Sequence, residues 1–107
     1  MSVIQMNKHQ FNEAVFQGNA PVLVEFWAPW CVYCRRIAPA LNKVAEQYGQ
    51  HLTVAQINID DEPMLANQEQ IEVIPTLILY QNGCAVDSVV APESKAKIDE
   101  FISAALG

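Results

Sequence analysis

Positively charged side chains are scarce in this sequence, with 6 lysines and arginines against 12 aspartates and glutamates, for a net charge of −6. Because phosphate binding needs a clustered cationic surface, we expect no nucleic-acid partner. No stretch approaches the roughly 20 apolar residues that a membrane span needs, and the first residues lack the basic segment and apolar run of a signal peptide. Glycine (4) and proline (6) are few and no period recurs, which excludes collagen-like and repeat architectures. A cytoplasmic protein with no membrane partner is therefore predicted.

Apolar residues, in contrast, make up 51% of the 107 residues. A chain of this length and composition can bury one modest core, which excludes intrinsic disorder. We predict a single domain over residues 1–107 and a monomer.

Cysteine is also rare, and two of its three copies form a CxxC pair, Cys31 and Cys34. A structural zinc site usually needs a second such pair or histidines at ligand spacing, and His9 and His51 lie far apart with no other ligands near them. We therefore expect neither a metal nor a cofactor, and we interpret the pair as redox-active. Cys84 has no nearby thiol in the sequence and is interpreted as a bystander.

The hydrophobic pattern alternates between strand and helix along the chain. Asn7, with Gln10 three residues on, has the pattern of a helix N-cap, and the apolar run 22–27 is typical of a strand covered on both faces. The predicted strands are 2–5, 22–27, 52–59, 76–80 and 84–90, and the predicted helices begin near Asn7, Cys31, Asp61 and Ser94. This order, βαβαβαββα, predicts an α/β fold with a central mixed five-stranded sheet flanked by four helices.

The segment from Val24 to Arg35, VEFWAPWCVYCR, resembles the active-site stretch of the thioredoxin family. The resemblance extends at matching spacing over essentially the whole chain, through the segments 37–39 (IAP), 58–60 (NID), 74–76 (IPT) and 82–83 (NG). It implies the thioredoxin fold and a thiol-disulfide oxidoreductase that reduces or exchanges protein disulfides, in electron transport and cell redox homeostasis. A thioredoxin reductase or a similar electron donor is the implied partner.

Four positions depart from the family's pattern. Val32-Tyr33 stands where the family generally has Gly-Pro, Glu25 where it usually has aspartate, Gln56 where a lysine commonly faces that acid, and Ala91 where a glycine is expected. Residue 33 thereby gains a backbone N–H that proline lacks. We expect this N–H to point at the Cys31 sulfur and to make the disulfide more oxidising than that of a Gly-Pro thioredoxin.

The candidate catalytic residues are Cys31, Cys34 and Glu25. Cys31 falls where the apolar strand ends and the helical pattern begins, and free N–H groups at a helix N-terminus favour a thiolate there. We expect Cys31 to be the nucleophile and Cys34, about one helical turn on, to be the resolving thiol. Glu25 lies inside an apolar strand, where desolvation should raise its pKa and suit it to exchange a proton with Cys34. The alternative for Glu25 is an edge glutamate that points to solvent.

The candidate substrate-binding residues are Trp30, Val32, Tyr33, Ile74, Pro75 and Ala91. Trp30 is expected to shield the dithiol and to offer apolar contact area, while Tyr33 narrows the surface offered to partners. The resemblance adds Pro75 as a cis-proline beside the dithiol, and Ile74, whose backbone would pair with a substrate chain as a strand does. Ala91 enters as the counterpart of the family's glycine.

Two other functions are left open by these residues. A glutaredoxin-like protein that uses glutathione would also carry a tyrosine at position 33, although such proteins usually have Thr-Val-Pro where this chain has Val73-Ile74-Pro75. A non-catalytic binding subunit with the same fold is the second alternative, and the presence of both cysteines weighs against it.

Overall fold

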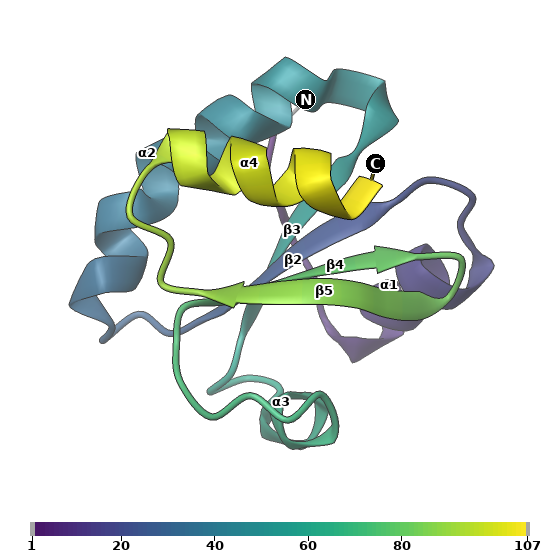
Figure 1. Cartoon of the computed structure of the whole chain (residues 1–107). Helices are drawn as coiled ribbons and strands as arrows, with labels where there is room; N and C mark the ends of the chain where they lie inside the picture. Colours follow the sequence, from purple (N-terminus) through teal and green to yellow (C-terminus); the bar gives the residue numbers. More distant parts are fainter. Residues whose placement is uncertain (1, 107) are drawn as a thin grey trace.

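Five strands form one mixed sheet in the order β1-β3-β2-β4-β5 in the computed structural model, which describes residues 2–106 (Figure 1). The strands are β1 (Ile4–Gln5), β2 (Val22–Trp27), β3 (Thr53–Asn58), β4 (Thr76–Gln81) and β5 (Cys84–Val90). β3 pairs in parallel with both β1 and β2, whereas β4 runs antiparallel to β2 and β5 antiparallel to β4. The long central strand β2 therefore has a neighbour on each side, and five of its six residues are buried.

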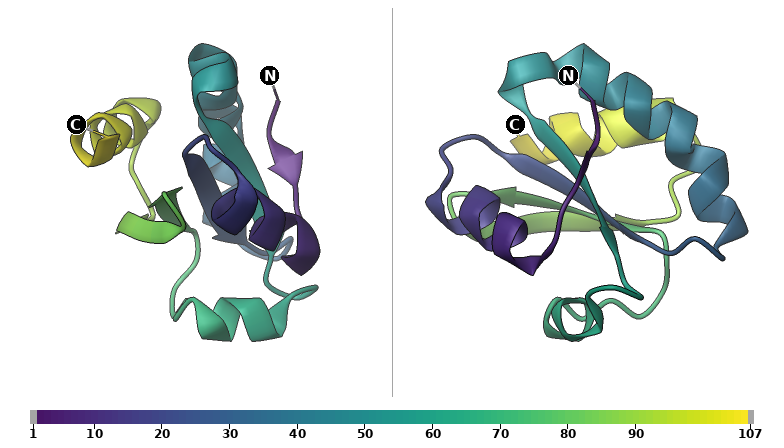
Figure 2. Two further views of the ribbon diagram at one scale, coloured as in Figure 1. Left: turned by 90° about the vertical axis from the view of Figure 1, so that its right-hand side faces the viewer. Right: turned by 180° about the vertical axis from the view of Figure 1, so that it is seen from behind.

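Four α-helices cover the two faces of this sheet (Figure 2). They are α1 (Lys8–Asn12), α2 (Val32–Tyr48), α3 (Pro63–Gln68) and α4 (Lys95–Leu106). The order of strands and helices confirms the fold class predicted from the sequence. Each helix within residues 2–106 is too short or too polar to cross a membrane.

Alternation along the strands divides the core into two layers. On one face, Leu23 and Leu77 pack with the buried residues of α2 and α4, including Leu41 and Ile98. On the other face, the residues are contributed by α1, α3 and the opposite side of the strands, namely Phe11, Val24, Phe26, Ile57, Leu65 and Tyr80. Because side chains alternate, Glu25 shares the α2 face of β2 with Leu23 rather than the face of Val24.

The helix caps follow the predicted chemistry, with one exception. Asn7 Oδ1 accepts the Gln10 N–H and Gln10 Oε1 accepts the Asn7 N–H, both at 2.8 Å, so α1 begins with a capping box. The helix predicted near Asp61 is present, but Asp61 is not part of it, because the Asp61 and Glu62 N–H groups both donate to the Asn58 carbonyl in a turn that follows β3. α3 begins at Pro63, without a side-chain cap.

One boundary near the N-terminus also differs from the prediction. β1 covers residues 4–5 instead of 2–5, since pairing with β3 is limited to Ile4 and Gln5. The first helix continues past α1 as a π-helical segment, η1 (Glu13–Gln17), and ends at Gly18. β4 and β5 form a hairpin and are joined by Asn82 and Gly83, whose φ angles of 57° and 79° fit a two-residue turn.

Candidate active site

The CxxC pair lies at the start of α2. Cys31 occupies the N-cap position with an extended backbone (φ −83°, ψ 108°), and the Cys34 N–H donates to its sulfur at 3.2 Å. A disulfide joins the two residues, whose Cα atoms are 5.3 Å apart. Cys31 is 9% exposed and Cys34 is 2% exposed. Cys31 is therefore the more exposed of the two residues, and its sulfur is the one that accepts a backbone hydrogen bond.

The identity of that donor corrects the expectation for Tyr33. An N-cap side chain accepts from the second or third helical residue, and here the third residue, Cys34, takes the role. Any residues between the cysteines leave this N–H in place. In the disulfide form, the Tyr33 N–H is therefore not the donor to the Cys31 sulfur. This hydrogen bond was the reason to expect that Val32-Tyr33 makes the disulfide more oxidising, and that reason is absent here.

Tyr33 instead makes its specific contact through the side chain. Its half-buried hydroxyl donates to the Pro92 carbonyl oxygen at 2.8 Å. The preceding residue, Ala91, has a φ of +46°, a conformation that favours glycine, and its N–H donates to the Pro75 carbonyl at 2.9 Å. The start of α2, the segment before β4 and the segment after β5 are thus linked by hydrogen bonds.

The segment before β4 lies directly against the cysteines. The Ile74–Pro75 peptide bond is cis, as the resemblance implies, and Ile74 packs against the small buried cluster of Ala28, Cys31 and Cys34. Ile74 belongs to no strand, so it takes no part in the hydrogen bonds of the sheet. Within residues 2–106 its backbone also makes no hydrogen bond to a turn or loop. Its N–H and carbonyl therefore remain available beside the disulfide.

Exposed apolar side chains surround the disulfide and Ile74. Trp30 is 63% exposed, Val32 is 54% exposed, and Val73, which the sequence analysis did not single out, is 55% exposed. The Trp30 indole N–H donates to the carboxylate of Asp60 at 3.1 Å, which fixes the ring from the loop after β3. The Trp30 ring stands largely in solvent, and its shielding of the dithiol stays a prediction. Trp27, half-buried, packs against the cysteines.

Glu25 is fully buried, so the interpretation as an edge glutamate that points to solvent is wrong. Burial raises the pKa of Glu25 to about 7, and a hydrogen bond from Gln56 Nε2 to Glu25 Oε1, 2.6 Å long, lowers it in part. The other carboxylate oxygen, Oε2, is buried without a hydrogen-bond partner among the described residues. At neutral pH this carboxyl can therefore either bind or release a proton.

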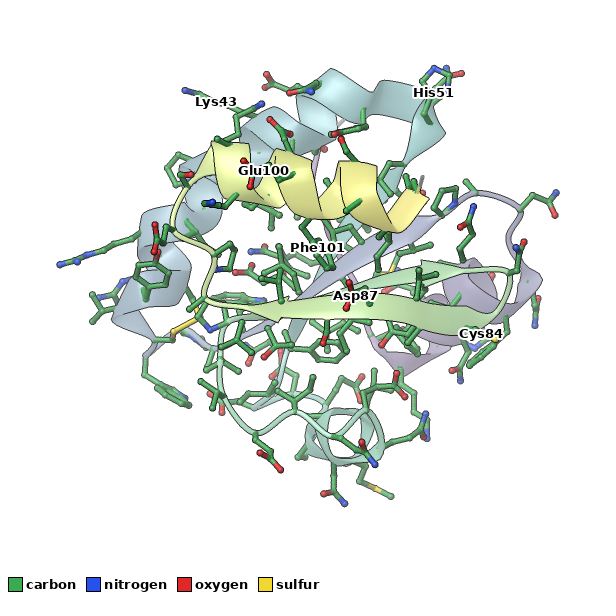
Figure 3. The ribbon with its side chains drawn as sticks, in the orientation of Figure 1. Lys43, His51, Cys84, Asp87, Glu100 and Phe101 are labelled. Atoms are coloured by element: carbon green, nitrogen blue, oxygen red, sulfur yellow. A yellow bond between two sulfur atoms is a disulfide. The ribbon has the colours of Figure 1, made fainter. Side chains whose placement is uncertain are left out.

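The third cysteine lies away from this site. Cys84 is exposed and free at the start of β5, at the opposite end of the β4–β5 hairpin from the yellow disulfide bond (Figure 3). The interpretation of Cys84 as a bystander stays a prediction. Within residues 2–106 no group of three or more histidine, cysteine, aspartate or glutamate side chains gathers to hold a metal ion.

A CxxC disulfide at the N-terminus of a helix that packs on the mixed sheet of an α/β fold is the arrangement of a thiol-disulfide oxidoreductase. The family model described as Thioredoxin matches residues 2–104. The chain is 41% identical over 98 residues to "Thioredoxin" of Pyropia yezoensis, covering 92% of each protein, and 38% identical over 103 residues to "Thioredoxin" of Porphyra purpurea, covering 96% of each. It is also 41% identical over 88 residues to "Thioredoxin 1" of Synechococcus elongatus, covering 82% of each.

The chain therefore belongs to the thioredoxin family, and its activity is that of a protein-disulfide oxidoreductase. These comparisons favour the first of the three functions considered from the sequence over the glutaredoxin-like and non-catalytic alternatives.

Proposed function

We propose that this protein reduces protein disulfides through Cys31 as nucleophile and Cys34 as resolving thiol. The Cys31 thiolate attacks one sulfur of the substrate disulfide and forms a mixed disulfide, and the other substrate sulfur leaves as a thiolate that takes up a proton. The Cys34 thiolate then attacks Cys31 Sγ, so the second substrate thiol is released and the Cys31–Cys34 disulfide remains. The observation that carries this assignment is the Cys31 sulfur at the N-cap of α2, where it accepts a backbone hydrogen bond and is the more exposed of the pair.

We propose Glu25 as the group that takes the proton from Cys34. Its burial on the sheet face covered by α2 supports this role, since Cys34 belongs to the first turn of α2. A pKa of about 7 suits a general base at neutral pH. The unpartnered Oε2 provides an atom that can accept the proton.

We propose that substrates bind the surface formed by Trp30, Val32, Tyr33, Ile74, Pro75 and Ala91. Exposed Trp30 and Val32 offer apolar contact, and the Ile74 backbone, free of other partners among residues 2–106, can pair with an extended substrate segment. Such pairing places a substrate disulfide beside Cys31, because Ile74 packs against the cysteines.

The remaining proposals concern the setting of the reaction. A thioredoxin reductase or a similar donor would restore the dithiol, which requires a reducing compartment such as the cytoplasm. There the protein would serve electron transport and cell redox homeostasis, as a monomeric single domain over residues 1–107. Size-exclusion chromatography with light scattering tests the oligomeric state, since a mass of twice 11.9 kDa would contradict a monomer.

The proposed function is tested by insulin-disulfide reduction with a thioredoxin reductase as electron donor. We expect turnover by the unaltered protein and none by the Cys31→Ser variant. Turnover of glutathione mixed disulfides in place of insulin would instead support the glutaredoxin-like alternative. If neither substrate is reduced and Cys31 of the reduced protein does not react with iodoacetamide at neutral pH, the non-catalytic alternative is correct.

A further inference from the structure

Three polar side chains form a row across the adjacent strands β1, β3 and β2, starting at the β1 edge of the sheet. In the strand register Gln5 of β1 lies opposite Gln56 of β3, and Gln56 lies opposite Glu25 of β2. Val3 and Val54, two residues before the two glutamines, belong to the core on the α2 face, so all three side chains of the row lie on that face. The row leads from exposed Gln5 through half-buried Gln56 to fully buried Glu25.

Hydrogen bonds connect this row in one direction. Gln5 Nε2 donates to Gln56 Oε1, and Gln56 Nε2 donates to Glu25 Oε1 at 2.6 Å. A primary amide has one carbonyl acceptor and one NH₂ donor. Because Gln5 donates to the carbonyl of Gln56, the NH₂ group of Gln56 must face Glu25. The donor from Gln5 thus favours the orientation in which the NH₂ end of Gln56 meets the buried carboxyl.

The surroundings of Glu25 on this face leave few other groups that could act on its charge. β4 contributes the uncharged Leu77, directly opposite Glu25, and α4 contributes Ile98 and Ile102 to the core. From the nearby first turn of α2 the titratable groups are Tyr33, whose hydroxyl is bonded to Pro92, and Cys34, which is in a disulfide. Arg35 of the same turn is exposed, and its guanidinium donates to the Pro29 carbonyl. The other titratable members of that face are Tyr48 of α2 and the Lys95–Asp99 ion pair of α4, both partly exposed.

We propose that Gln5 and Gln56 are positioning residues for the proton relay: the two amides hold Glu25 Oε1 as a hydrogen-bond acceptor and leave Oε2 as the atom that exchanges the proton. This inference rests on the proposed role of Glu25 as the proton acceptor for Cys34. The donor from Gln56 stabilises the ionised carboxyl without bringing a charge. If Gln5 is removed, Gln56 can turn its carbonyl toward Glu25, which favours the protonated carboxyl.

The test is the titration of the Glu25 carboxyl carbon, followed by NMR in the oxidised protein, in which neither Cys31 nor Cys34 titrates. We expect the midpoint in Gln56→Leu to lie about one pH unit above that of the unaltered protein, and the midpoint in Gln5→Leu to rise in the same direction by a smaller amount. The matched control is Gln50→Leu, at an exposed position in the segment Gly49–His51, which should leave the midpoint unchanged. An unchanged or lower midpoint in Gln56→Leu, or an unchanged one in Gln5→Leu, would overturn the inference.

A second measurement separates this inference from the proposed role of Glu25. The pH profile of disulfide reduction should shift by the same amount as the NMR midpoint in each variant, which supports both. A midpoint that moves while the rate profile stays fixed would show that Glu25 is not the proton acceptor, although the amide row still controls its ionisation. A rate profile that responds to Glu25→Gln while no midpoint moves in the glutamine variants would keep the relay and refute the role of the row.

Discussion

Replacing Glu25 by glutamine should stabilise the oxidised protein at pH 8 and have much less effect at pH 5. The substitution removes a charge that is fully buried between the sheet and α2. It keeps an oxygen that can accept the Gln56 hydrogen bond. In the oxidised protein the two active-site cysteines do not titrate, so the effect isolates the carboxyl.

The expected magnitude follows from the difference between the two pKa values of Glu25. Burial raises this pKa from the ordinary 4.5 to about 7 in the folded protein, and each unit of difference corresponds to about 1.36 kcal/mol. Between pH 4.5 and 7 the folded protein holds a proton that the unfolded chain has released. Its free energy of unfolding therefore falls by about 1.4 kcal/mol per pH unit as the pH rises, and levels off above 7. The Glu25→Gln variant lacks this loss. Its free energy of unfolding should therefore exceed that of the unaltered protein by about 3 kcal/mol at pH 8 and by under about 1 kcal/mol at pH 5.

Urea denaturation of the oxidised proteins at several pH values measures this difference. Glu46→Gln is the matched control, because Glu46 is an exposed residue of α2 without a hydrogen bond or ion pair among the described residues, and it should show no comparable trend with pH. A Glu25→Gln advantage that is the same at pH 5 and pH 8 would refute the assignment of a raised pKa to Glu25.

Three further changes test the site. Tyr33→Phe removes the hydrogen bond to Pro92 and should lower the free energy of unfolding by about 1 kcal/mol, measured by urea denaturation; Tyr48→Phe, whose hydroxyl makes no hydrogen bond within residues 2–106, should not. Ala91→Gly relieves a φ of +46°, a conformation that costs other residues about 1–2 kcal/mol, and should stabilise by roughly 0.5–1 kcal/mol because glycine also loses more chain entropy; a lower melting temperature would contradict this. Glu25→Gln should slow insulin reduction at pH 7, and an unchanged rate would exclude Glu25 from proton transfer.

The parts of this site that the sequence predicts correctly are those determined by neighbouring residues. The change from an apolar strand to a helical period places Cys31 at a helix N-terminus, and the apolar residues on both sides of Glu25 indicate its burial. The cap of α1 follows from Asn7 and Gln10 for the same reason, since both partners lie within one turn.

The contacts that could not be predicted join residues far apart in the sequence. Tyr33 and Pro92 are 59 positions apart, and Gln5 and Gln56 are 51 apart. Tyr33 of α2 meets the segment after β5 only through the packing of the whole fold. Gln5 and Gln56 meet through the register of β1 and β3, where a one-residue slip would turn either side chain to the other face. In the disulfide form the donor to the Cys31 sulfur is Cys34 rather than Tyr33. The sequence does not predict this choice, because an N-cap side chain can accept from either of two N–H groups.

The most direct test of the proposed mechanism is to identify which cysteine forms the mixed disulfide with a substrate. Reduced Cys34→Ser and Cys31→Ser variants would each be incubated with a disulfide-containing protein such as insulin, quenched with acid, and analysed by non-reducing electrophoresis and mass spectrometry. If Cys31 is the nucleophile, Cys34→Ser accumulates a stable mixed disulfide through Cys31, and Cys31→Ser accumulates none. Trapping of substrate through Cys34 in the Cys31→Ser variant, with none in Cys34→Ser, would contradict the mechanism.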